Sequence, residues 1–242
     1  RDRSVSRGLG DVYKRQMLHS MRQFDDLTYV HSVNVALIAS ILGQWLKFSE
    51  KDIRILTISG LLHDIGKIMI PNEILTKPGK LTVAEYNIMK QHVNFGYEKV
   101  KNQNIDIRIK EACLLHHEKC DGTGYPFGLK SDHIPAVAKI IAIADVYDAM
   151  TSARVYRGAL CPFEVIDTMY KDAFTKFEPE YILPFLKNVA SSYINNDVRL
   201  SDGRIGKVVL INENALSLPI VQCEDEFIDL SKTRGLTVSA IL

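Results

Sequence analysis

The sequence predicts a mainly α protein, in which an all-helical bundle is followed by a small C-terminal β module of barrel or sandwich type. Apolar residues recur at helical spacing, with capping residues and prolines between the helices, over residues 17–190. Over residues 195–242 the pattern changes to short apolar runs separated by turn residues, which is typical of strands. These two patterns predict a helical domain followed by an accessory β module.

Residues 1–16 differ from the rest of the chain, because they are rich in Arg, Gly and Ser and have no apolar period. We expect them to be a disordered basic arm or a non-native extension, and we exclude them from the fold prediction. The native start of the protein is then expected to be missing from this sequence.

The first two helices are predicted from apolar spacing and one capping pattern. An apolar face over about residues 28–47 predicts the first helix. Ser49 and Asp52 then match a capping box, which predicts a second helix that runs to about Gly66.

The middle of the domain contains a second capping pattern and a loop rich in glycine. Thr82 and Glu85 match a capping box and predict a helix that runs past His92. A further helix over about residues 106–118 is expected to stop at the loop DGTGYPFG, residues 121–128.

Prolines mark the remaining helix starts, since proline fits the first turn of a helix. Pro135 opens a long helix that reaches about Ser152. Pro162 and Pro179 open the last two helices. In the tail, the turn at residues 201–204 separates short apolar runs, and four or five strands are expected there.

Composition narrows the classes of function. The formal net charge is +1, whereas a protein that grips long nucleic acid through its phosphates usually has a basic excess. The four cysteines form no CxxC pair, which favours a reducing compartment over a disulfide framework. No apolar stretch is long enough for a membrane segment, and no signal peptide is evident. We therefore expect a cytoplasmic protein with a small substrate.

Histidines within apolar helices indicate a metal site. Five of the seven histidines lie on or at the ends of these helices: His31, His63, His92, His116 and His117. A single buried histidine is most often a satisfied core residue, but five neutral imidazoles each need partners for both ring nitrogens. A shared metal satisfies all of them together. Asp145 lies in an apolar run, where an unpaired carboxylate is costly, so a nearby cation is expected.

The number of candidate ligands favours two ions. Five imidazoles and two carboxylates exceed what one ion needs, and Asp64, directly after His63, can supply a bridging oxygen. Mixed nitrogen and oxygen ligands suit divalent transition metals better than Mg or Ca. Fe or Mn is favoured, with Zn, Ni or Co as alternatives. Cys120 lies close to the His116–His117 pair in sequence and is interpreted as a small loop residue.

Four segments occur in a fixed order along the helical domain. They read HDIGK at 63–67, QHVNFGYE at 91–98, HHEKCDGTGYP at 116–126 and IIAIADVYDAMTSARVYR at 140–157. Together they resemble the HD-GYP family of metal-dependent phosphodiesterases, and the match extends over residues 29–185. An HD pair alone is a weak signal, but the ordered set with its GYP loop is specific. The resemblance implies an HD-type helical bundle.

The resemblance implies a role for each matched position. Two overlapping sets would hold the two ions: His31, His63, Asp64 and Asp145, and Asp64, His92, His116 and His117. Lys67, Arg154 and Arg157 would contact substrate phosphate, and Lys67 and Asp64 are the expected catalytic residues. Some members add an acidic residue four positions before the first histidine to recruit a third metal. Leu27 stands there, which predicts two ions.

The resemblance also implies the substrate, cyclic di-GMP, which would be opened to pGpG and in some cases cut on to GMP. Sensor or GGDEF-type domains are the candidate partners. Tyr125 and Tyr156 could stack on a base or simply pack the loop, and Asp148 is expected to support a ligand or cap the helix. Two alternatives stay open: a phosphohydrolase acting on another cyclic dinucleotide or nucleotide, and a degenerate binding module.

Overall fold

The computed structural model describes residues 26–152 and 159–242, and the chain divides into two compact units. One unit ends at Asp148 and the other begins at Ala149. The expected basic arm at residues 1–16 lies outside the described residues, and the domain bounds 17–190 and 195–242 stay a prediction. No described helix is both long and apolar enough to cross a membrane.

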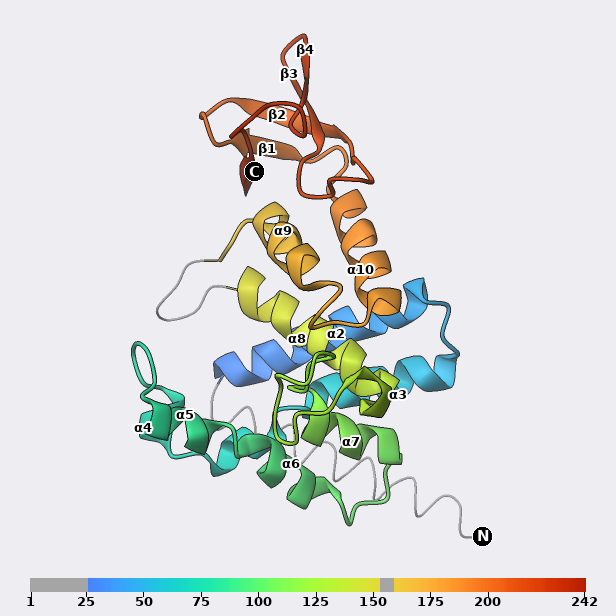
Figure 1. Ribbon diagram of the computed structural model, residues 1–242, viewed down its shortest axis with the longest axis vertical. Coiled ribbons are helices and arrows are strands. Elements are labelled where there is room, and N and C mark those ends of the chain that lie inside the picture. Colours follow the sequence, from blue (N-terminus) through green and yellow to red (C-terminus); the bar gives the residue numbers. More distant parts are fainter. Residues whose placement is uncertain (1–25, 153–158) are drawn as a thin grey trace. The chain divides into compact units, whose positions relative to one another are not determined.

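The first unit is helical, as predicted. Its elements are α2 (Asp26–Trp45), α3 (Glu50–Leu62), the 3-10 helix η1 (Ile65–Met69), α4 (Asn72–Leu75), α5 (Val83–Met89), α6 (His92–Val100), α7 (Ile107–Leu115), the 3-10 helix η2 (Ser131–His133) and α8 (Ala136–Thr151), whose last turn belongs to the second unit. α3 packs on α2 and α7, and α6 packs on η1 and α7. Figure 1 shows these helices in blue to yellow-green.

Capping residues start the helices where the sequence indicates. The Ser49 side chain accepts from the Asp52 backbone N–H at the start of α3. The capping box of Thr82 and Glu85 is complete at the start of α5, with both of its hydrogen bonds formed. Each bond satisfies a backbone donor that the first helical turn leaves without a partner.

Three predicted helices are shorter than expected, and all three differences concern the site. The helix from Ser49 ends at Leu62 instead of about Gly66, so His63 follows it. The helix from Thr82 does not run past His92: α5 ends at Met89, and α6 begins anew at His92. The helix before the glycine-rich loop ends at Leu115, so His116 and His117 follow it. These breaks place four of the histidines at helix ends rather than on helical faces.

A glycine allows η1 to lie against the start of α6. A Cβ added to Gly66 would stand 1.9 Å from the His92 carbonyl oxygen and 2.4 Å from the Gly96 backbone nitrogen. Any side chain there would push the two elements apart. Gly66 therefore brings the His63–Asp64 corner next to His92.

The second unit combines two helices with an antiparallel sheet. It contains α9 (Pro162–Asp172), α10 (Pro179–Ser192), β1 (Asp197–Leu200), β2 (Ile205–Leu210), β3 (Ile220–Cys223), β4 (Glu226–Asp229) and β5 (Val238–Ile241). α9 contacts both α10 and β5, and Figure 1 shows the two helices side by side. The strand order is β4-β3-β2-β1-β5. The predicted β module is confirmed and has five strands, but they form one open sheet with β4 and β5 at its edges instead of a closed barrel or a sandwich, because these two edge strands do not pair with each other.

Candidate metal centre

The first unit gathers all seven predicted ligands. α2 supplies one histidine, the ends of α3 and α7 supply three, the start of α6 supplies one, and two aspartates complete the set: His31, His63, His116, His117, His92, Asp64 and Asp145. Most of these side chains are buried, and His117 is the most accessible, with 26% of its side chain exposed. Such a concentration of imidazole and carboxylate inside a protein needs a common partner.

Backbone carbonyls fix the orientation of three histidines. Their Nδ1 atoms lie 2.8 to 2.9 Å from carbonyl oxygens one turn earlier in the chain: His63 from Gly60, His92 from Met89 and His116 from Ala112. A carbonyl can only accept, so each Nδ1 carries the proton and donates. The Nε2 atom of each ring is then left with a free lone pair, which is the form that binds a metal.

A carboxylate orients the fourth histidine. His31 Nδ1 lies 2.6 Å from Asp148 Oδ2, and the Asn34 side-chain amide donates to Asp148 Oδ1 at 2.9 Å. His31 Nε2 faces Asp145 Oδ1 at 3.0 Å. Asp148 therefore contacts a predicted ligand on the side away from Asp145, and its negative charge would make the His31 ring a stronger donor to a cation.

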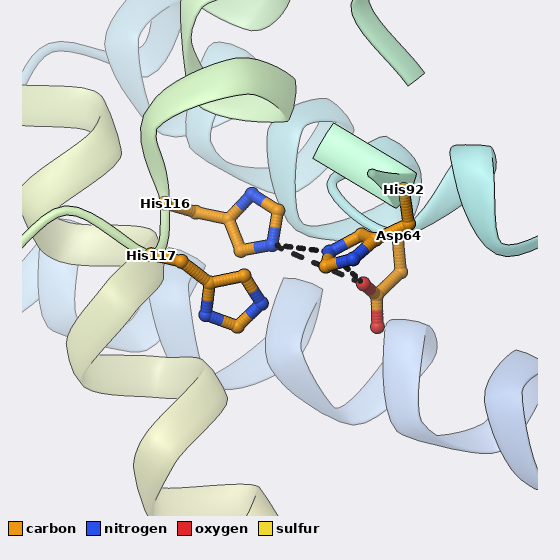
Figure 2. Close-up of side chains that lie close together, drawn as sticks. All are labelled: Asp64, His92, His116 and His117. Carbon is orange, nitrogen blue, oxygen red and sulfur yellow. Dashed lines mark hydrogen bonds and ion pairs between the residues drawn. The ribbon is translucent and has the colours of Figure 1, made fainter. Parts of the chain in front are cut away.

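Asp64 lies between two pairs of histidines. Its Oδ2 is 3.2 Å from His63 Nε2 and 3.7 Å from His31 Nε2. Its Oδ1 is 3.3 Å from His92 Nε2 and 3.9 Å from His116 Nε2. Figure 2 shows His92 and His116 directed at this carboxylate, with His117 beside them. The two oxygens of the Asp64 carboxylate thus face two separate pairs of ring nitrogens, which is the arrangement expected of a carboxylate that bridges two metal ions.

Several buried nitrogen and oxygen atoms of the centre have no hydrogen-bond partner within the described part of the protein. Among the described residues, His63 Nε2 and Asp64 Oδ1 are buried without a hydrogen bond. His92 Nε2 and His116 Nε2 face each other at 3.4 Å, although neither ring has a proton left on that atom. Asp64, His92, His116 and His117 can present one ligand atom each within 4.8 Å of one another, as can His31, His63 and Asp64. These donor sets fit metal ions.

Electrostatics keep His116, His117 and Asp64 in the forms that bind cations, whereas His31 stays protonated without one. Burial lowers the pKa of His116 well below its usual value and that of His117 to about 3, so both imidazoles are neutral. Burial opposes the ionisation of Asp64, but Lys67 and His63 hold its pKa well below the usual range. Burial alone would lower the pKa of His31, yet its hydrogen bonds to Asp145 and Asp148 raise it to about 9. A cation must therefore displace a proton from His31.

Lys67 enters the same centre from η1. Its Nζ lies 2.5 Å from Asp64 Oδ2, so the ammonium is next to the oxygen that faces His63 and His31. The position leaves Lys67 beside any anion held over the Asp64 carboxylate. Its contact with substrate phosphate stays a prediction, and Arg154 and Arg157, like Tyr156, lie outside the described residues.

The glycine-rich loop forms one wall of the centre. The Tyr125 ring stacks on the His117 ring, with centroids 4.8 Å apart and planes at 26°. A Cβ on Gly124 would lie 2.4 Å from the Lys119 backbone nitrogen and 2.6 Å from the His117 carbonyl oxygen. Glycine is therefore needed where the loop passes the histidine pair. The loop is close enough to shape what binds above His117.

A buried glutamate that sequence reasoning missed holds this loop. Glu118 is 4% exposed, and its carboxylate accepts from three consecutive backbone N–H groups: Phe127 at 2.7 Å, Gly128 at 3.2 Å and Leu129 at 2.9 Å. A signal was present, since an acidic residue directly after the histidine pair would be expected either to bind metal or to pair with buried donors. Asn34 was missed as well, and nothing in its local sequence marks it.

The sequence is similar to one protein family and to several characterised proteins. The model of the family described as HD domain matches residues 14–181. Cyclic di-GMP phosphodiesterase PA4108 of Pseudomonas aeruginosa is 36% identical over 203 residues, which is 84% of this chain and 49% of that protein. The 3'3'-cGAMP-specific phosphodiesterase 2 of Vibrio cholerae is 36% identical over 158 residues, 64% of this chain and 30% of that protein.

A solved structure supports the fold. Bd1817, an HDG"Y"P protein from Bdellovibrio bacteriovorus, superimposes with a TM-score of 0.54 at 23% identity and covers 64% of this chain and 50% of that one. The chain spans half or less of the length of each of these relatives.

Proposed function

Because the chain belongs to the HD domain family, in its HD-GYP group, we propose that it hydrolyses a phosphodiester bond of a cyclic dinucleotide at a centre of two divalent transition-metal ions. One ion would be held by His31, His63, Asp64 and Asp145. The other would be held by Asp64, His92, His116 and His117. Bound divalent ions supply an activated water and polarise the phosphoryl oxygens.

The position of Asp64 is the observation that supports this proposal most directly. A mononuclear site would need only one of its oxygens, but each oxygen faces its own pair of ring nitrogens at 3.2 to 3.9 Å. Holding both oxygens in place fixes the spacing of the two ligand groups. A phosphodiester that lies over Asp64 would then have its non-bridging oxygens directed at both groups.

Lys67 would act on the phosphate itself. Its ammonium lies beside Asp64 Oδ2, and the Lys67 side chain is 22% exposed, whereas that of Asp64 is 2% exposed. There it can bind a non-bridging phosphate oxygen and offset the negative charge that develops as the bond to the leaving oxygen breaks. We also propose that Arg154 and Arg157 contact substrate phosphate and that Tyr125 contacts the substrate above His117.

The favoured substrate is cyclic di-GMP, with pGpG as the first product. Relatives of similar identity act, by their names, on cyclic di-GMP or on 3'3'-cGAMP. The second of these is therefore the alternative substrate. A degenerate binding module is less compatible with the site, because each of the seven ligand positions has a residue that can coordinate a metal.

Anaerobic purification followed by metal analysis and product analysis tests the proposal. Two ions per chain, together with conversion of cyclic di-GMP to pGpG, are expected. A parallel assay with 3'3'-cGAMP distinguishes the two substrates. If a protein loaded with two ions leaves both cyclic dinucleotides intact, the proposed activity is wrong, and fewer than two ions with no turnover would favour the degenerate module.

A further inference from the structure

A lysine beside the metal centre is held between two aromatic rings. Lys90 lies at the C-terminal end of α5, two residues before His92. Its Nζ is 5.3 Å from the centroid of the Tyr86 ring and 5.9 Å from that of the Tyr125 ring. Both distances are within the range at which a cation is attracted to an aromatic face. The two rings therefore define where the ammonium stands.

The ammonium of Lys90 has no counter-anion among the described residues, although the side chain is partly buried. Lys77, by contrast, has a carboxylate partner, because its Nζ lies 2.7 Å from Glu85 Oε2 on α5. Lys67 is likewise paired, with Asp64. A cation that lies partly out of water between two rings and has no carboxylate partner is suited to bind an anionic ligand.

The two rings place this cation at the edge of the metal centre. The Tyr125 ring that contacts Lys90 Nζ also stacks on the His117 ring at 4.8 Å, and its centroid lies 6.5 Å from that of His92. Tyr86 is 48% exposed, so it leaves the subsite accessible from solvent. Lys90 and Lys67 thus belong to different parts of the site, one beside Tyr125 and the other beside Asp64.

A cyclic dinucleotide has two phosphodiester groups, one of which would be cleaved at the metal centre. We propose that Lys90 binds the other one, and that Tyr86 and Tyr125 form the walls of this subsite. The inference rests on the proposed function. A cyclic dinucleotide holds two phosphodiesters in one ring, and only one of them can lie over Asp64 at a time. The second keeps its negative charge and needs a cation a short distance away. Lysine is a common point-charge partner for phosphate.

The test compares a substrate that has two phosphates with one that has a single phosphate. Bis(p-nitrophenyl) phosphate needs only the metal centre, whereas cyclic di-GMP would use the Lys90 subsite as well. In Lys90→Met the KM for cyclic di-GMP should rise at least about tenfold more than the KM for bis(p-nitrophenyl) phosphate, as expected for one lost charge-assisted bond. Lys90→Arg should recover most of this difference, and added salt should weaken cyclic di-GMP binding more in the native protein than in Lys90→Met.

A matched control and a second readout separate this inference from the proposed activity. Lys80→Met removes an exposed lysine from the loop before α5 and should change neither KM. If cyclic di-GMP is bound but not cleaved, its Ki against bis(p-nitrophenyl) phosphate hydrolysis replaces KM, so the activity proposal can fail while the Lys90 subsite is still measured. Equal effects on the two substrates, no effect at all, or a native protein that binds no cyclic dinucleotide would each overturn the subsite.

Discussion

Replacing Asp148 by Asn should weaken the binding of one metal ion and leave the other nearly unchanged. The carboxylate of Asp148 accepts from His31 Nδ1 at 2.6 Å and from the Asn34 amide at 2.9 Å. An asparagine has one acceptor oxygen in place of two, so its own amide group must face either His31 or Asn34, both of which are donors. The variant therefore loses the charge and at least one of the two hydrogen bonds.

The size of the effect follows from the bond that is lost. A hydrogen bond between a charged carboxylate and an imidazole contributes about 1.5 to 3 kcal/mol, which corresponds to roughly 10- to 150-fold in affinity. Loss of an outer partner of a metal-binding histidine has a similar effect. Of the histidine ligands, His31 is the one whose Nδ1 contacts Asp148, because those of His63, His92 and His116 donate to backbone carbonyls. The carboxylate nearest to His117 Nδ1 is that of Asp145, at 3.8 Å. The loss should fall on the ion bound by His31.

Competition against a chromophoric chelator under anaerobic conditions measures both affinities in one titration. Asn34→Ala is the matched control, since it removes the neutral neighbour and keeps the carboxylate behind His31, and its two metal affinities should stay within about threefold of the native values. Thermal unfolding of the metal-free proteins checks that the variants fold. If Asp148→Asn weakens both ions equally, or weakens neither, Asp148 does not act through His31 and the reasoning fails.

Four further outcomes follow from the same contacts. Asp64→Ala should lose both ions and all activity, and metal analysis that finds one ion retained would exclude the bridging role. Lys67→Ala should keep both ions and lose turnover, so loss of metal would assign it a different role. Glu118→Ala leaves three loop N–H groups without their acceptor and should lower the free energy of unfolding, measured in urea, by about 3 kcal/mol or more. Glu118→Gln should lose less stability. Equal stability of the native protein and both variants would contradict this role of Glu118. Hydrogen bonds from Lys77, and from Thr82 at the capping box, lower the pKa of Glu85 to about 2 from an ordinary 4.5. The ionised Glu85 should therefore stabilise the fold fully above pH 4.5, and this stabilisation should be lost as the pH falls towards 2. An NMR titration midpoint near 4.5 would show that these bonds are absent in solution.

Local signals in the sequence predicted most of the helical unit. Capping boxes and prolines depend on neighbouring residues only, so the starts of α3, α5, α9 and α10 lie where the sequence indicates. The break before His92 was not predictable, because the segment YNIMKQHVNF contains no glycine or proline that would interrupt a helix. The contact of Gly66 with the His92 backbone belongs to tertiary structure. In the same way, the strand pattern predicts the number of strands, but sheet closure depends on which strands meet at the edges.

The candidate site also has features that the sequence predicts and features that depend on tertiary structure. The ligand types were predictable, since buried histidines and aspartates need partners whatever the fold. The partners that orient them differ in range: the carbonyl partners of His63, His92 and His116 lie three or four residues away in the chain, whereas Asp148 lies 117 residues from His31. Glu118 and Lys90 act through the folded loop and through Tyr125, so their contacts could be recognised only in three dimensions.

Helix ends explain how neighbouring residues in this chain can share one centre. On a regular α-helix adjacent side chains diverge by about 100°, so two consecutive residues cannot both point at the same ion. His63 and Asp64 stand where α3 gives way to η1, and His116 and His117 stand directly after α7. Of the three ligands without an adjacent ligand, His31 and Asp145 lie within the regular helices α2 and α8, and His92 is the first residue of α6. Paired ligands thus require the regular helix to stop at the site, and α3 and α7 both end there.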